Sequence, residues 1–416
     1  MFDMPIDMLF IMVLQYMIKV LLEPFFYIVV FLVYWQCRSL MEQQYYLFGQ
    51  KNIKLSKMVA EFTGIGIIGG IFASMIMVIT GLPINNIGLE YLWPLAIFLL
   101  FVNARFICFA YAGGLIALSS IIFGWPYIEA SHVLALVAIL HVTESVLVFL
   151  GSTFSALPVY IMHKGKAAGA FMLTSFWPLP LLMMISISLP THELGEFLKM
   201  PDWWPLFPYA QPAPEGHSNV LLPIAFAAVL GYSSIAVTKT PKEKRQFSAM
   251  ALFVYSICLF AFAYLSIDNY VFGILAALVS IGGHELVVYL DQQMEKNGEA
   301  IYQGSPDRFV VLSTIYKTPA YRAGIKAGDV IVKLNDNTVF DERDIALVTR
   351  YLPIKFSMEV LRNGKIIKKQ AQFLDGEEKI LGLIRMPVKG RDRFLEIDGN
   401  YSFIRKWLRK LKRWHA

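Results

Sequence analysis

Long apolar stretches recur along the chain down to about Tyr289, and they constrain the fold more than any other feature. A run of about 18 or more apolar residues is long enough to cross the hydrocarbon core of a bilayer as a helix. Beyond Tyr289 such runs stop, and Lys, Arg, Asp and Glu become frequent. Hydrophobic residues make up 56% of the chain and charged residues 16%, and the mean hydropathy of +0.54 is higher than that of soluble domains. We therefore expect a membrane domain over residues 1–293, followed by a water-soluble part.

The apolar pattern predicts a polytopic α-helical domain with about nine membrane spans. They are placed at residues 21–37, 62–80, 89–103, 106–124, 132–151, 170–189, 220–238, 247–265 and 271–289. The segment 2–20 is also apolar but contains Asp3, Asp7 and Lys19. It is predicted to be a re-entrant or interfacial helix, with a tenth span as the alternative. No small-residue cleavage site follows it, so a removable signal peptide is not indicated.

Positive charge is concentrated in alternate loops of this predicted topology. One set of loops holds eleven cationic residues, whereas the other set holds only Lys199. The eleven are Arg38, Lys51, Lys54, Lys57, Arg105, Lys164, Lys166, Lys239, Lys242, Lys244 and Arg245. Because short cytoplasmic loops collect Lys and Arg, the first set is predicted to be cytoplasmic. By parity, everything beyond Gln292 is then cytoplasmic too.

Few polar residues interrupt the predicted spans. Ionisable residues within a membrane are functional candidates, because their burial in lipid is costly. His141 and Glu144 lie three residues apart in the fifth predicted span, hence on one helix face. They form either a polar contact that joins two helices or part of a transport or proton pathway. Gly66 and Gly70 have the spacing that allows close helix packing.

The last predicted span contains "GGHELVVYL", which invites comparison with the zinc-binding H-E-x-x-H helix of membrane proteases. His284 and Glu285 match, but Val288 occupies the position of the second histidine, and valine cannot bind zinc. The predicted spans also contain no Asp that would complete such a site. The three cysteines, Cys37, Cys108 and Cys258, lie in or beside spans and indicate neither a disulfide framework nor a thiolate metal site. The sequence therefore predicts no catalytic residue, no metal and no cofactor.

Residues 297–375 are predicted to form a small α+β domain, a β-barrel with two helices. "FVVLSTI" and "VIVKL" have the composition of strands. Between them, "AYRAG" predicts one helical turn closed by Gly324 in a left-handed conformation. Asp341 is placed to cap a helix that runs to about Tyr351. The turn Asn363-Gly364 is typical of a tight β-hairpin.

The stretch "VVLSTIYKTPAYRAGIKAGDVIVKLND" resembles the core of a bacterial PDZ domain. The resemblance is carried by the spacing of Pro319, Ala320, Gly324, Gly328 and Asp329. A PDZ domain binds an extended peptide as an added strand. The resemblance therefore implies a peptide groove along the predicted helix, with Ile345 and Val348 facing the ligand.

The carboxylate-binding loop of PDZ domains, a Gly-apolar-Gly-apolar pattern, is not recognisable before Phe309. The only candidate there is "AIYQGSPDR", which contributes Ile301 and Tyr302. Because the usual pattern is missing, internal segments or folded surfaces remain ligand candidates beside free C-termini.

The predicted architecture consists of many spans followed by one PDZ domain, without protease residues. It resembles that of the MinJ family of polar division-site proteins of Gram-positive bacteria. "EPFFYIVVFLVYWQCR" near the N-terminus and the "HE" before the PDZ part add to the likeness. The resemblance implies a scaffold or adaptor in the bacterial cell membrane, at septum and poles, that bridges DivIVA-like and MinD-like proteins. The alternatives are a transporter or channel with a regulatory PDZ domain, in which His141 and Glu144 would act, and a degenerate site-2-protease-like protein.

After a predicted linker over residues 376–400, residues 401–416 predict a basic amphipathic helix. Its apolar face consists of Ile404, Trp407, Leu408, Leu411 and Trp414 at helical spacing, and Lys and Arg cover the rest. Trp and Leu can enter the acyl boundary while the cations attract anionic lipids. Membrane docking is therefore predicted. A solvated tail or a nucleic-acid-binding arm is the alternative, and no other feature predicts a nucleic-acid partner.

Overall fold

The computed structural model describes residues 4–48, 54–151, 156–193, 198–209, 211–376 and 378–388. The predicted tail helix over residues 401–416, with its predicted binding to anionic lipids, lies outside the described residues. So does the second half of the predicted linker.

Among the described residues, five helical segments are long and apolar enough to cross a membrane, so the prediction of about nine spans is wrong. They lie in α2 (Pro24–Phe48), α3 (Leu55–Thr80), α6 (Ala130–Leu150), α7 (Pro241–Leu265) and the continuous segment Tyr270–Asn297. That last segment consists of α8 (Tyr270–Leu278), the π-helical turn η4 (Val279–Gly283) and α9 (His284–Asn297). These five segments agree with the conclusion from composition that this is a membrane protein.

Two of the predicted spans are short helices. They are α4 (Leu89–Val102) and α5 (Phe109–Phe123), joined by the 3₁₀ turn η1 (Ala104–Ile107). At 1.5 Å per residue each is about 21–23 Å long, less than the roughly 30 Å of a hydrocarbon core. The helix α5 runs antiparallel to α8, because Gly114 faces Ile281 whereas Ile121 faces Gly273. The start of α5 therefore lies beside the middle of the Tyr270–Asn297 segment.

The N-terminal apolar segment forms α1 (Ile6–Leu22), which has 17 residues. Leu9, Val13 and Met17 are buried against α3 and the strands β2 (Lys166–Pro190) and β3 (His217–Ala236). Most apolar side chains on its other face are exposed. One face of α1 thus packs on the protein, and the opposite face remains apolar at the surface.

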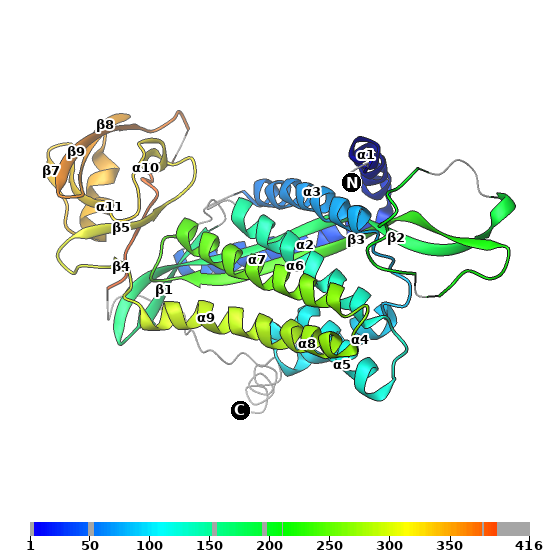
Figure 1. Cartoon of the computed structure of the whole chain (residues 1–416). Coiled ribbons are helices and arrows are strands. Elements are labelled where there is room, and N and C mark those ends of the chain that lie inside the picture. The colour runs from blue at the N-terminus through cyan, green and yellow to red at the C-terminus, as the bar shows by residue number, and fades with distance from the viewer. Residues whose placement is uncertain are drawn as a thin grey trace, which may run out of the picture.

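The sixth and seventh predicted spans are strands rather than helices. The strand β2 pairs antiparallel with β3 from Phe171↔Ala236 to Pro190↔His217. The strand β1 (Ala156–His163) pairs with the start of β2, and the short β4 (Tyr302–Gln303) pairs there as well. At about 3.3 Å per residue, β2 is about 80 Å long, and it runs lengthwise beside the helices (Figure 1).

The edge of β2 that faces away from β3 is covered by α3. A Cβ on Gly66 would lie 2.2 Å from the carbonyl oxygen of Pro178, and one on Gly70 would lie 2.1 Å from that of Pro180. The two glycines therefore allow close packing, as expected, but against a strand instead of a helix. The two prolines have no N–H to satisfy on this edge.

The next donors along the same edge have side-chain partners. Ser74 in α3 accepts the N–H of Leu182 through its hydroxyl, at 2.8 Å. The side-chain amide of Asn85 bonds both the N–H and the carbonyl of Ser186, at 2.6 and 2.9 Å. In a membrane, where water cannot satisfy the backbone, these partners make an interior strand tolerable.

The C-terminal domain is an open sheet, so the prediction of a β-barrel is wrong. Its strand order is β10-β5-β6-β8-β9, and β7 pairs with β6. The strands are β5 (Phe309–Thr314), β6 (Val330–Leu334), β7 (Asn337–Thr338), β8 (Lys355–Arg362), β9 (Lys365–Gln372) and β10 (Leu383–Arg385). The strands β10 and β9 lie at opposite edges and do not pair with each other, so the sheet stays open. The two predicted helices are present as α10 (Pro319–Arg322) and α11 (Glu342–Tyr351).

Local predictions within this domain are confirmed. Asp341 caps α11 in a capping box with Asp344. Asn363 and Gly364 have φ values of 51° and 76° in the turn between β8 and β9. However, β10 lies beyond residue 375, in the segment predicted to be a linker.

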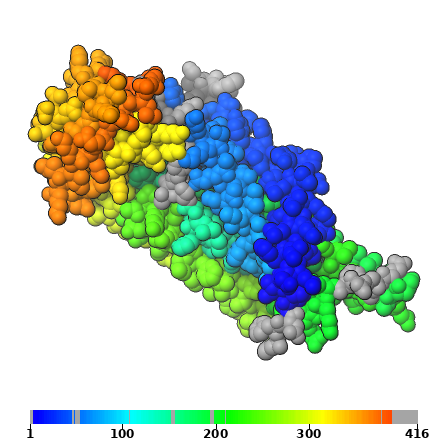
Figure 2. All heavy atoms as spheres, turned by 90° about the horizontal axis from the view of Figure 1, so that it is seen from above, coloured from blue at the N-terminus to red at the C-terminus, as the bar shows by residue number. Residues whose placement is uncertain are grey.

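The C-terminal domain packs at one end of the membrane domain (Figures 1 and 2). Lys57 at the start of α3 donates to the Tyr316 hydroxyl at 2.9 Å, and in the stretch that leads into this domain Glu299 pairs with Lys164 at 3.1 Å. An apolar cluster that includes Tyr160, Leu312 and Ile384 joins the two sheets. Several of the lysines that predicted a cytoplasmic side therefore gather at this same end.

Candidate functional site

The motif residues that resemble a PDZ core have structural roles in the C-terminal domain. The buried carboxylate of Asp329 accepts two hydrogen bonds from Arg362, both 2.7 Å long, and the N–H of Lys326 at 2.9 Å. Arg362 also donates to the carbonyl of Gly324 at 2.9 Å. The bonded carboxylate raises the pKa of the Arg362 guanidinium. This bidentate pair holds the loop between α10 and β6.

The remaining motif residues shape the same loop. Pro319 and Ala320 are buried in α10. Gly324 and Gly328 have φ values of 73° and 89°, a region that favours glycine. The N–H of Ala320 donates to the carbonyl of Leu381 at 3.1 Å, which fastens α10 to the segment that leads into β10.

The segment that leads into β10, and β10 itself, run antiparallel to α11. Near the C-terminal end of α11, Lys379 donates to the carbonyl of Leu352 at 2.9 Å. Near its N-terminal end, Arg385 lies 3.4 Å from the carboxylate of Glu342. The carbonyl of Arg385 accepts a hydrogen bond from Tyr160 of β1 at 2.8 Å. Since β10 is an edge strand, the domain presents a strand edge beside a helix, and this edge meets the membrane domain at Arg385.

The four predicted peptide-binding residues are not all brought together. Ile345 is 8% exposed and belongs to the core of the C-terminal domain, and Val348 packs against the same core. Ile301 instead donates its N–H to the carbonyl of Val237. Tyr302 is buried in β4, opposite Gly169. The chain therefore joins the membrane-domain sheet at residues 301–303, before the C-terminal domain begins.

The strand that does lie beside α11 is not among the elements predicted from the sequence. The stretch "LGLI" over residues 381–384 follows the turn-forming pair Asp375-Gly376. A short apolar run with a glycine after such a turn is a signal that could have predicted β10.

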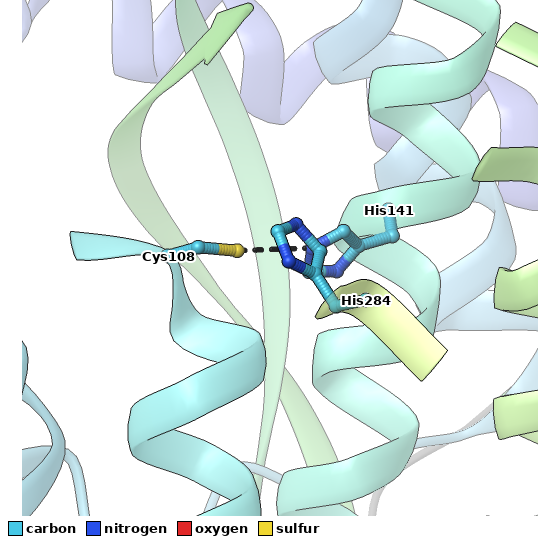
Figure 3. Close-up of side chains that lie close together, drawn as sticks. All are labelled: Cys108, His141 and His284. Atoms are coloured by element: carbon cyan, nitrogen blue, oxygen red, sulfur yellow. Dashed lines mark hydrogen bonds between the residues drawn. The ribbon is translucent and has the colours of Figure 1, made fainter. Parts of the chain in front are cut away.

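In the membrane domain, the structure brings His141 next to two residues that are remote in sequence. Its Nε2 lies 3.1 Å from the Sγ of Cys108, and His284 lies beside both. Ligand atoms of the three residues all lie within 4.8 Å of one another. Figure 3 shows the three side chains pointing toward one another from the start of α5, from α6 and from α9.

The orientation of His141 is fixed by its second ring nitrogen. Nδ1 lies 2.7 Å from the carbonyl of Val137, one turn earlier in α6. Because a carbonyl can only accept, Nδ1 carries a hydrogen, and in the neutral imidazole Nε2 then has a lone pair directed at Cys108. Such a backbone partner on the far nitrogen is typical of metal-binding histidines.

His284 follows directly after the π-helical turn η4. The hydroxyl of Tyr255 donates to the carbonyl of Ser280 in this turn at 2.9 Å, and Ser280 donates through its own hydroxyl to the carbonyl of Ala110 at 2.7 Å. The Nδ1 of His284 is buried and has no hydrogen-bond partner among the described residues. Single π turns are frequent at functional sites, because they re-aim the side chains that follow.

Glu285, the residue after His284 in α9, connects this helix to the η1 turn and to α5. Its carboxylate accepts from the Tyr111 hydroxyl at 2.7 Å and pairs with Arg105. Arg105 was expected in a cytoplasmic loop, but its partner lies near the middle of the Tyr270–Asn297 segment. It is therefore a poor indicator of topology.

His141 and Glu144, which lie on one helix face, are not hydrogen-bonded to each other. His141 instead contacts Val137 and Cys108. Among the residues that the structure describes, Glu144 has no hydrogen-bond or ion-pair partner. An unpaired charged carboxylate is costly inside a membrane domain, and a nearby positive charge would compensate for it.

Comparisons with known proteins do not assign the chain. No protein-family model matches it, and no curated protein matches it either. The function is therefore inferred from the residues and their geometry.

Proposed function

We propose that this chain is a membrane-anchored adaptor whose C-terminal domain binds partner proteins by accepting an extended segment as an added strand. The observation that carries the proposal is the edge strand β10, whose Arg385 contacts Glu342 at the start of α11, while Lys379 in the segment before the strand contacts Leu352 at the end of the helix. In strand addition, backbone hydrogen bonds provide affinity and side-chain pockets provide specificity. The resemblance of residues 310–336 to bacterial PDZ domains supports the same binding mode.

The partner is expected to pair with the part of β10 that precedes Arg385, since the Arg385 carbonyl is bonded to Tyr160. The lysines that gather near the C-terminal domain favour a cytoplasmic position for it, in a multi-pass protein of the bacterial cell membrane. The resemblance to the MinJ family supports DivIVA-like and MinD-like division proteins as partners, at the septum and poles. Anchoring would hold the binding edge near the bilayer, where such partners assemble.

Site-specific photo-cross-linking of the full chain in native membranes tests the proposal. A cross-linking residue at Ala346, exposed on α11 between its two contacts with the β10 segment, is expected to give defined adducts with partner proteins. The matched control is Ile366, which is 65% exposed on β9 at the opposite edge of the sheet. Partner adducts that are equal at both positions, or absent at Ala346, would contradict strand addition at this edge.

A further inference from the structure

We infer that the membrane domain binds one transition-metal ion of the zinc and copper class through Cys108, His141 and His284. The three residues come from different elements, and their ligand atoms lie within 4.8 Å of one another. Thiolate and imidazole are the ligands that this class of ions prefers. This binding site is independent of the adaptor function and lies away from the C-terminal domain.

The spacing of the ligand atoms suits such an ion after a small adjustment. With metal–sulfur bonds of about 2.3 Å and metal–nitrogen bonds of about 2.0–2.1 Å, tetrahedral coordination holds ligand atoms roughly 3.3–3.6 Å apart. The Sγ of Cys108 and the Nε2 of His141 are already 3.1 Å apart. His284 needs to approach by little more than ~1 Å, a movement within the reach of side-chain rotation.

The two histidines are prepared for coordination in different ways. The hydrogen bond from Nδ1 to the Val137 carbonyl leaves Nε2 of His141 unprotonated and directed at the site. His284 has a buried Nδ1 without a partner among the described residues. An unsatisfied buried nitrogen is unfavourable, and a metal bond would satisfy it.

Charge balance gives a role to Glu144, which is partly buried in α6. A divalent ion bound to the Cys108 thiolate leaves one net positive charge, which is costly in a membrane domain unless it is paired. Glu144 lies one helical turn beyond His141 and supplies the missing negative charge. A monovalent copper ion would be neutralised by the thiolate alone. Glu144→Gln is therefore expected to weaken Zn²⁺ binding more than Cu⁺ binding.

Cys108 also has a structural role that must be separated from metal binding. Its Sγ accepts the N–H of Ala110 at 3.4 Å and so caps α5. Serine is a good helix cap but a poor ligand for these ions. Cys108→Ser therefore removes the metal ligand and preserves the cap.

The experiment uses the full chain, purified in detergent, stripped with a chelator and reloaded separately with Zn²⁺ or Cu⁺. We expect one ion per chain after desalting, by elemental mass spectrometry, and thiolate-to-metal charge transfer in the Co²⁺-substituted protein. Cys108→Ser is expected to lose the charge-transfer band and at least about tenfold in affinity. The matched controls are Cys258→Ser and His217→Gln, which change exposed residues of the same types.

His284→Gln provides a second ligand variant in case Cys108→Ser does not elute as a single species in gel filtration. It is expected to lose metal as well. A wild-type protein that retains neither ion overturns the inference, and so does a well-folded Cys108→Ser or His284→Gln variant that retains as much metal as the two controls.

Discussion

Replacing Gly66 with alanine is expected to destabilise the membrane domain, although alanine is the better helix former. A Cβ at this position of α3 would lie 2.2 Å from the carbonyl oxygen of Pro178. That oxygen belongs to the backbone of β2, which is paired with β3, so it cannot rotate away as a side chain could. The methyl group therefore requires α3 and β2 to separate, at a cost of about 1–3 kcal/mol.

Gly64, two residues earlier in the same helix, provides a matched control. A Cβ there would meet no atom within 4 Å. Gly64→Ala is expected to stabilise by about 1 kcal/mol through helix propensity alone. Gly66→Ala gains the same helix propensity, so the two alanine variants should differ in their free energy of unfolding by the steric cost alone, about 1–3 kcal/mol. Gly70→Ala forces the same separation through Pro180, so the double variant Gly66→Ala, Gly70→Ala should cost less than the sum of the single changes.

The assay is denaturant-induced unfolding of the full chain in detergent, followed by tryptophan fluorescence. Gly66→Ala should unfold at a lower denaturant concentration than the wild type, and Gly64→Ala at an equal or higher one. If the two variants unfold at the same denaturant concentration, α3 does not contact β2 through Gly66.

Two further predictions concern single hydrogen bonds and single glycines. Ser74→Ala should destabilise the membrane domain by about 1–3 kcal/mol in the same assay, because the N–H of Leu182 loses its acceptor in the interior. An unchanged unfolding midpoint would contradict the hydrogen bond between Ser74 and the edge of β2. Gly382→Ala should release β10 from the sheet, measured as faster amide hydrogen exchange over residues 381–386, because a Cβ would lie 2.2 Å from the Thr318 hydroxyl. Gly376→Ala is the control, since it has a similar positive φ of 75° but open space around it, and equal exchange in both variants would refute the role of the contact.

Features set by a few neighbouring residues could be predicted from the sequence. The cap at Asp341 and the turn at Asn363-Gly364 depend on local chemistry, and both form as expected.

That β2 is a strand rather than a helix could not be predicted from its apolar pattern. A strand buried on both faces has a continuous apolar run, and at this length the run is also that of a membrane helix. The pair Pro178 and Pro180 was the available signal, because prolines inside a helix remove hydrogen bonds and clash with the preceding turn.

The cluster of Cys108, His141 and His284 could not be found by searching for motifs. Its members lie 33 residues apart and then, from 141 to 284, a further 143 residues apart. The H-E-x-x-H comparison tests only for ligands on one helix, and the absence of a histidine at Val288 says nothing about ligands from elsewhere. The packing of α5 against α8 and the π turn before His284 bring the residues together, and neither is encoded in a spacing rule.

The long pair of β2 and β3 also has a consequence for how the chain is made. A helix satisfies its own backbone and can enter lipid alone, whereas a strand exposes its donors until its partner arrives. During synthesis β2 emerges before β3, after α3 and α6 have been completed. The earlier helices must therefore shelter β2, with Ser74 and Asn85 ready on one edge, until the ribosome has delivered residues 217–236 to the other. Biogenesis of this protein thus depends on the order of synthesis, and a chain stalled between the two strands would leave the β3-facing edge of β2 unpaired at the membrane.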